Sequence, residues 1–222
     1  MSVKPILGTM NFGPQVGIED SLKMVELFVS EGFKEFDTAY VYNDGDSEKF
    51  LGNALKNINS GSPIIATKVN PRITGRLDRE SIQAQLQESL SRLQRKSVDI
   101  LYLHFPDPTT PLYETLECCS ELHKKGYFKE LGLSNYPAWQ VVHIWHLCKE
   151  NGWLTPSVYQ GLYNGLSRNI EAELMPALRE LGMRFYAFNP LAGGILSGKH
   201  SDIDNITSGR FTHRPNYKER YW

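Results

Sequence analysis

Short apolar runs alternate along the chain with segments whose apolar residues recur at helical spacing. Seven runs have the length of a strand, at residues 6–7, 33–36, 64–67, 98–103, 128–133, 158–159 and 184–188. A helical segment follows each of the first six, and none is expected after the last. Repeated β-then-α units predict a parallel sheet covered by helices, either an open doubly wound sheet or a closed barrel.

Two of the helical segments carry clear end signals. One has apolar residues at 22, 25, 28 and 29 and is expected to stop at Gly32. The other has apolar residues at 82, 86, 90 and 93, and Asp78 stands before it as a candidate cap. Because no Pro/Gly/Ser-rich linker or low-complexity segment divides the chain, we expect residues 1–222 to form a single domain.

Polar or aromatic residues stand directly after nearly every predicted strand. They are Asp37, Lys68, His104, Ser134 with Asn135, Gln160, and Phe188 with Asn189. Such groups converge on one point if the sheet closes into a (β/α)8 barrel, where the carboxyl ends of the strands carry the active site. An open sheet would instead gather its ligand groups at a single switch point. We therefore expect an α/β fold of the TIM barrel type.

Four residues suggest a shared chemistry: Asp37, Tyr42, Lys68 and His104. A tyrosine with its ordinary pKa of about 10 is a poor acid at neutral pH, but a nearby ammonium favours the phenolate and lowers that pKa. Asp37 would keep the Lys68 ammonium charged, and a neutral histidine can orient a carbonyl oxygen. Any one of these residues alone is better explained as structural. The four together predict proton delivery to an oxygen while a hydride reaches the carbonyl carbon.

Two further groups suit a dinucleotide. Ser134, Asn135 and Gln160 offer the donors and acceptors that a carboxamide needs, although such residues singly are more often turn or cap residues. The glycine-rich stretch at residues 189–199 would let the backbone approach phosphate oxygens, although a flexible loop is the more usual role. This stretch nearly matches the P-loop motif of nucleotide-binding proteins, but His200 stands where that motif needs Ser or Thr.

Other features have structural explanations. His143 and His146 lie near Cys148 in an ordinary helical pattern, so no metal site is expected there. The acidic stretch at residues 43–48 lacks the ligand spacing of a calcium loop and is explained by a helix cap. Cys118 and Cys119 are expected on a packed helix face.

Composition narrows the class of protein. The 24 Lys and Arg nearly balance 25 Asp and Glu, so no charge pattern favours nucleic acid or an anionic membrane. Hydrophobic residues at 41% over 222 residues are typical of a globular domain. The apolar runs are too short to span a membrane, and the first ten residues lack the apolar core of a signal peptide. Three cysteines form no disulfide framework, so a cytoplasmic protein is expected.

Taken together, these pieces resemble the aldo-keto reductases, and within them the branch of the aflatoxin-aldehyde reductases. The matching segments are LGTMNFG, FDTAYVYNDGDSEKFLG, YLHFPDPTTP, GLSNYPAW, VYQGLYN and FYAFNPLAGGILSGK. They come in family order and cover nearly the whole chain. The resemblance implies a barrel enzyme that reduces aldehydes and some ketones with NADPH bound across the barrel mouth.

The resemblance also implies a role for each matching residue. Tyr42 would be the general acid, tuned by Lys68 and Asp37, and His104 would orient the substrate carbonyl. Ser134, Asn135 and Gln160, with Asp37 close by, would hold the nicotinamide carboxamide. The nicotinamide ring would stack on the side chain of Phe188, where the family often has tyrosine. The remaining cofactor contacts would be Asn189, Pro190, Leu191, Ala192, Gly193, Gly194, Ile195, Leu196, Ser197, Gly198, Lys199 and Arg210, and Met10 and Trp222 would line the substrate mouth.

The carboxyl end departs from the family. A complete barrel has eight units and about 250 residues, whereas the units predicted here end with the seventh strand and the cofactor loop. The eighth unit and the segment that grips the adenosine 2'-phosphate have no counterpart in these residues. We therefore expect a barrel truncated after its seventh unit, and the choice of NADPH over NADH rests on the resemblance.

The predicted function is NADPH-dependent reduction of aldehydes, with dialdehydes or small semialdehydes as candidate substrates. A homodimer is a candidate assembly, and neither nucleic acid nor membrane is an expected partner. Two alternatives stay open. One is a truncated and catalytically inactive product. The other is a regulatory or binding subunit, as in the potassium-channel β subunits of a neighbouring branch, although those carry asparagine where this chain has His104.

Overall fold

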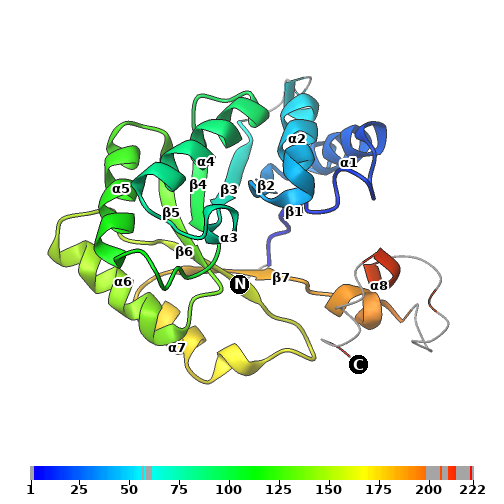
Figure 1. The fold of residues 1–222 in the computed structure, drawn as a ribbon. Coiled ribbons are helices and arrows are strands. Elements are labelled where there is room, and N and C mark those ends of the chain that lie inside the picture. The colour runs from blue at the N-terminus through cyan, green and yellow to red at the C-terminus, as the bar shows by residue number, and fades with distance from the viewer. Residues whose placement is uncertain are drawn as a thin grey trace. The chain divides into compact units, whose positions relative to one another are not determined.

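The computed structural model describes residues 3–56, 58, 62–198, 206, 210–213 and 221. The chain divides into two compact units, Met1–Ser157 and Val158–Trp222 (Figure 1). The expected single domain over residues 1–222 stays a prediction, and each unit is described by itself. In the described part of the chain, no helix combines the length and the apolar character needed to cross a bilayer.

The described part of the first unit holds a parallel sheet of five strands in chain order. They are β1 (Leu7–Gly8), β2 (Glu35–Asp37), β3 (Ile64–Val69), β4 (Val98–Leu103) and β5 (Phe128–Ser134). Parallel pairing places Asp37 beside Ala66, Lys68 beside Tyr102, and Tyr102 beside Gly132. Their side chains contribute to the buried core of this unit together with those of the helices, and every residue from 100 to 103 is at least 99% buried.

Helices connect these strands and pack against one another in chain order. They are α1 (Ile18–Ser30), α2 (Asp46–Lys56), α3 (Pro71–Thr74), α4 (Arg79–Leu93), α5 (Leu112–Lys124) and α6 (Ala138–Glu150), with a 3-10 turn η1 (Tyr42–Gly45) before α2. Helix α2 contacts α1 and α4, and α5 contacts α4 and α6. Figure 1 shows α4 and α5 side by side along β3, β4 and β5. The helices thus cover the sheet as expected for crossover connections between parallel strands.

Local signals set the ends of two helices. The Asp78 carboxylate accepts a hydrogen bond of 2.9 Å from the Ser81 N–H, so the predicted cap of α4 is confirmed. Helix α1 ends just before Gly32, whose φ of 85° belongs to the left-handed region that glycine adopts without steric cost. The predicted stop is therefore confirmed as well.

The second unit pairs β6 (Val158–Leu162) with β7 (Arg184–Phe188) in parallel. Between them lie a 3-10 turn η2 (Asn169–Glu171) and α7 (Leu174–Glu180), so this unit repeats the order of strand, helix, strand. A 3-10 turn η3 (Ala192–Ser197) and the short helix α8 (Arg210–His213) follow β7. The expectation that no helix follows the last strand was therefore wrong.

Five predicted strands differ in their bounds: the first is shifted by one residue, to Leu7–Gly8, the third and fifth extend further, to Val69 and Ser134, and the second and sixth differ most. The second was expected at residues 33–36, but β2 begins at Glu35, because the Phe33 ring packs on Phe28 of α1 at 5.2 Å instead of joining the sheet. The sixth was expected to end at Tyr159, but β6 continues to Leu162. Gln160 lies inside this strand and pairs with Tyr186, so a polar residue does not mark its end.

Candidate active site

Lys68 and Asp37 form a buried ion pair at the carboxyl ends of two neighbouring strands. The Lys68 side chain is 0% exposed, and its ammonium donates to Asp37 Oδ1 and to the Thr38 carbonyl oxygen, each at 2.5 Å. Burial by itself lowers the pKa of Lys68, but the Asp37 carboxylate and the Tyr42 phenol outweigh it, so this pKa lies above its ordinary value. The structure therefore holds a charged ammonium in the interior.

Tyr42 lies beside this ammonium at the start of η1. Lys68 Nζ is 4.9 Å from the centre of the Tyr42 ring, and the phenol is also a hydrogen-bond partner of Lys68. The His104 ring lies 5.8 Å from the Tyr42 ring at an interplanar angle of 81°. The structure thus brings together Asp37 of β2, Lys68 of β3, Tyr42 of η1 and His104, which directly follows β4.

The turn that carries Tyr42 has an unusual backbone. Asn43 and Asp44 have φ values of 49° and 53° in the left-handed region, and Gly45 follows at 90°. The Asn43 side-chain amide donates to the carbonyl oxygens of Met10 at 2.9 Å and Phe12 at 2.7 Å. The predicted helix cap for this acidic stretch was wrong for Asn43, because its side chain instead ties the turn to the segment after β1.

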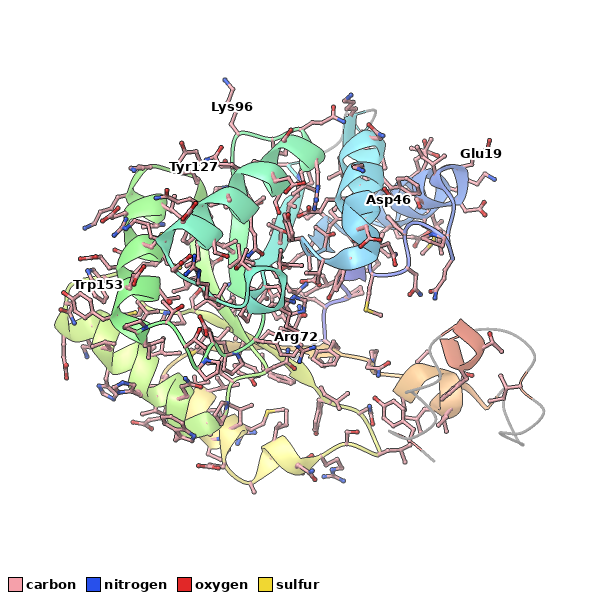
Figure 2. All side chains as sticks on the ribbon, viewed as in Figure 1. Glu19, Asp46, Arg72, Lys96, Tyr127 and Trp153 are labelled. Atoms are coloured by element: carbon pink, nitrogen blue, oxygen red, sulfur yellow. The ribbon has the colours of Figure 1, made fainter. Side chains whose placement is uncertain are left out.

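His104 follows β4 and is nearly buried. Burial and the positive charges of Lys68 and Arg72 lower its pKa to about 2, so its imidazole is neutral at ordinary pH. The side chain of Arg72, labelled in Figure 2, comes from the segment after β3, whereas Lys96 marks the opposite end of the sheet, just before β4. The site therefore lies at the carboxyl ends of the strands, as predicted for a barrel.

Asn70 determines which imidazole nitrogen of His104 carries the proton. The Asn70 side-chain oxygen accepts from the Arg72 N–H at 2.9 Å, which assigns its nitrogen as the atom 3.3 Å from His104 Nδ1. An amide nitrogen only donates, so Nδ1 must accept. A neutral His104 then carries its proton on Nε2, where it can donate to a ligand.

Sequence reasoning missed Asn70, although it stands only two residues after Lys68. The side chain of Gln85 on α4 fixes the backbone of Asn70 through two hydrogen bonds. The Asn70 N–H donates to Gln85 Oε1 at 2.8 Å, and Gln85 Nε2 donates to the Asn70 carbonyl oxygen at 3.1 Å. A polar residue after the β3 strand was the available signal. Its role depends on the position of His104, which lies 34 residues later.

Ser134 ends β5, and Asn135 follows it next to His104. Ser134 is buried, and Asn135 has a left-handed φ of 64°. Asn135 Nδ2 donates to the His104 carbonyl oxygen at 2.9 Å and to Ser134 Oγ at 3.0 Å. The amide hydrogens of Asn135 are thus used within the protein, and its Oδ1 can accept from a ligand.

In the second unit, the loop after β7 folds on itself. Gln160 is buried on β6, and Phe188 ends β7 half-buried. Asn189 accepts at its Oδ1 from the Gly193 N–H at 3.1 Å, and its backbone oxygen accepts from the Ala192 N–H at 3.0 Å. The amides that were expected to face phosphate are in part used inside the loop. Any phosphate contact must involve other groups of this segment.

Several predicted site residues stay without a structural account. Lys199 and Trp222 lie outside the described residues, as does the side chain of Arg210. Met10 is half-buried, and only its carbonyl oxygen has a described role, as the acceptor from Asn43. Among the described residues, no group of three or more His, Cys, Asp and Glu side chains is placed to hold a metal ion.

A family comparison accounts for this set of side chains. The model of the aldo/keto reductase family matches residues 5–220. The chain belongs to the aldo/keto reductase family. Its fold class is accordingly confirmed as an α/β barrel of the TIM type, of which the described residues hold seven β strands in β-then-α order.

Individual members of the family show the same relationship. The chain is 47% identical to aflatoxin B1 aldehyde reductase member 2 of Rattus norvegicus, over 98% of this chain and 61% of that protein. It is 46% identical to the Homo sapiens protein of the same name, over 99% of this chain and 64% of that protein. It is 47% identical to human aldo-keto reductase family 7 member A3, over 98% of this chain and 68% of that protein. The predicted resemblance is thereby confirmed, and the chain spans about three fifths of the length of the first of these relatives.

Proposed function

We propose that this sequence carries the proton-transfer groups of an NADPH-dependent reductase that converts aldehydes to alcohols, with Tyr42 as the general acid. The observation that carries the proposal is the fully buried Lys68 ammonium, held by Asp37 and placed beside the Tyr42 phenol. The membership in a family of reductases, and relatives named for an aldehyde substrate, support it. The overall reaction consumes an aldehyde, NADPH and a proton and yields an alcohol and NADP+.

Tyr42 would give its proton to the carbonyl oxygen. An ordinary tyrosine pKa of about 10 makes this transfer unfavourable, but an adjacent ammonium stabilises the phenolate that is left. Lys68 can supply that stabilisation because Asp37 keeps it charged despite complete burial. The proton and the stabilising charge therefore come from one preorganised pair, in which the Lys68 ammonium is shielded from water.

His104 would orient the substrate. Its neutral imidazole, protonated on Nε2, can donate a hydrogen bond to the same carbonyl oxygen that receives the Tyr42 proton. An imidazolium would instead place a second full charge beside Lys68. Burial and the charges of Lys68 and Arg72 exclude that state at ordinary pH. Asn70 fixes the tautomer that this role requires.

NADPH, when bound, would supply the hydride for the carbonyl carbon. Asn135 Oδ1 can accept from the amide of the nicotinamide, with Ser134 next to it. By the family pattern Gln160, the Phe188 ring, the segment from Asn189 to Lys199, and Arg210 would complete the contacts. Dialdehydes or small semialdehydes are the proposed substrates, Met10 and Trp222 would face them, and a cytoplasmic homodimer is the proposed assembly.

The test is the oxidation of NADPH by this chain with an aldehyde, compared with the Tyr42→Phe variant. Removing the phenolic hydroxyl should lower kcat by about 100-fold or more, because general acid catalysis typically contributes 10²–10⁴-fold. NADPH should still raise the melting temperature of the variant. Tyr113→Phe, an exposed tyrosine on α5, is the matched control. Equal turnover by Tyr42→Phe and the parent chain, or no NADPH effect on either melting temperature, would refute the proposal.

A further inference from the structure

Arg92 of α4 reaches into the first unit towards the turn that carries Tyr42. Its guanidinium is largely buried, with 13% of the side chain exposed. It donates to the Tyr40 carbonyl oxygen at 2.9 Å and to Glu88 Oε1 at 2.6 Å, and it lies 4.4 Å from the centre of the Tyr40 ring. One planar cation therefore holds the backbone, and covers the ring, of a residue two positions before Tyr42.

A buried carboxylate anchors Arg92 in turn. Glu48 of α2 is 0% exposed, and its Oε2 accepts from Arg92 Nη1 at 3.2 Å. Its other oxygen accepts from the Thr67 hydroxyl at 2.6 Å, and Thr67 precedes Lys68 on β3. The planar guanidinium of Arg92 donates through two nitrogens to two carboxylates, those of Glu48 and Glu88, and this fixes its orientation. The compact ammonium of a lysine has no plane that could be fixed in this way.

The backbone of Tyr40 is thus held on both of its polar groups. Its N–H donates to the Lys68 carbonyl oxygen at 3.2 Å, while its own carbonyl oxygen accepts from Arg92. The next turn approaches the same guanidinium closely, because a Cβ atom built on Gly45 would lie 2.5 Å from Arg92 Cζ. Arg92 therefore contacts the segment on both sides of Tyr42.

We propose that Arg92 is a positioning residue for Tyr42. Held by Glu48, its guanidinium fixes the Tyr40 carbonyl and the left-handed turn up to Gly45, and so sets the phenol against Lys68. Asn43 secures the same turn from the side of Met10 and Phe12. The inference rests on the proposed function for its catalytic consequence, but the positioning itself is a structural property that is measurable without turnover.

The Arg92→Lys variant tests the proposal, since it keeps the charge and loses the planar fork. The matched control is Arg79→Lys on the same helix, where Arg79 pairs with Glu117 and Glu121 away from the Tyr40–Gly45 turn. We expect faster hydrogen exchange of the amides at 40–45 in Arg92→Lys and unchanged exchange there in Arg79→Lys. Equal exchange in both variants would overturn the proposal.

Titration of Tyr42 gives a second readout that a merely structural role would leave unchanged. The near-ultraviolet tyrosinate signal of each protein, minus that of its Tyr42→Phe counterpart, reports this phenol alone. The charged and titratable groups around it are Lys68 and His104, which lie near the Tyr42 ring, and Asp37, which pairs with Lys68. In Arg92→Lys the midpoint should move to higher pH, because the phenolate sits less closely on Lys68. An unmoved midpoint would contradict the proposal.

Kinetics separates this inference from the proposed function. Arg92→Lys should lower kcat for aldehyde reduction by about 10- to 100-fold, as expected when a reacting group is misplaced by roughly 1 Å, and leave the KM for NADPH near its original value. If the parent chain reduces no aldehyde, the proposed function fails. Exchange and titration still decide the role of Arg92.

A further variant covers the case in which Arg92→Lys does not fold. Gly45→Ala keeps the Arg92 and Glu48 charges but pushes a methyl group into the guanidinium. Gly32→Ala is the control, because Gly32 has a similar φ of 85° and a Cβ added there would meet no other atom within 4 Å. It therefore measures the effect of placing alanine in a left-handed backbone conformation, without any contact with Arg92. We expect faster exchange at 40–45 and a displaced Tyr42 midpoint only in Gly45→Ala. Parent-like values for that variant would overturn the proposal.

Discussion

Replacing Asp37 by Asn leaves a buried ammonium without its carboxylate. Lys68 is 0% exposed, and its other described acceptors are the neutral Thr38 carbonyl oxygen and the Tyr42 phenol. Breaking a buried ion pair by removing one partner typically costs about 3–5 kcal/mol. Because the Asn side-chain oxygen can still accept from Lys68, we expect a loss near the lower end, about 3 kcal/mol of unfolding free energy at neutral pH.

The loss depends on pH in a defined direction. In the parent chain the pKa of Lys68 is raised above its unfolded value, so the stabilisation by this pair is complete below about pH 10.4 and is lost as pH rises through the folded pKa. Burial is the largest single influence on the Lys68 pKa, so we expect that pKa to be lowered once the Asp37 carboxylate is removed. The unfolded chain then binds more protons, so the stability of the variant rises with pH. The difference between the two proteins should therefore shrink towards about pH 10.

Urea unfolding followed by circular dichroism, near neutral pH and near pH 10, measures both quantities. Asp20→Asn is the matched control, because Asp20 pairs with Lys23 at 3.3 Å while both side chains are about 70% exposed. Such a surface pair contributes at most about 1 kcal/mol. A loss below about 1 kcal/mol for Asp37→Asn, or a loss of equal size at both pH values, would show that the Lys68 charge does not depend on Asp37.

Three further outcomes are expected. Gly132→Ala should lower the unfolding free energy by about 1–3 kcal/mol in urea titrations, because the added Cβ would lie 2.3 Å from a Tyr102 ring carbon. Asp78→Ala should cost about 1 kcal/mol in the same assay, since Ser81 loses its capping partner. The His104 imidazole should show no titration near its ordinary pKa of about 6.5 by NMR, and its burial should make stability fall as pH drops below that value.

The sequence was sufficient to predict strands that are mostly apolar and mostly buried. The run from Val98 to Leu103 coincides with β4, because its apolar residues at 98 and 100–103 are what a parallel strand covered on its faces requires, and Asp99 is its only polar residue. Prediction was less accurate where a side chain had a partner on another element. Phe33 has high strand propensity, yet Phe28 of α1 draws its ring out of the sheet.

The candidate catalytic residues could be found because each follows a predicted strand, and the parallel register then brings such ends together. The residues that hold them could not be found in this way. Asn70 acts on a histidine from the next strand, and Arg92 acts on a turn about 50 residues earlier in the chain. Neither partner is near in sequence, so no local pattern marks the pair. The left-handed backbone of Asn43 likewise depends on carbonyl groups more than 30 residues away.

All four proton-transfer candidates, and the side chains that brace them, come from the first unit of the chain. During synthesis the amino-terminal part of a protein leaves the ribosome first and generally folds as a unit. Lys68 and Asp37 are both present once β3 has been made, and the next strand, β4, brings Tyr102 beside Lys68 and is followed by His104. The buried charge can therefore be neutralised within the nascent chain, before the glycine-rich loop after β7 has been made.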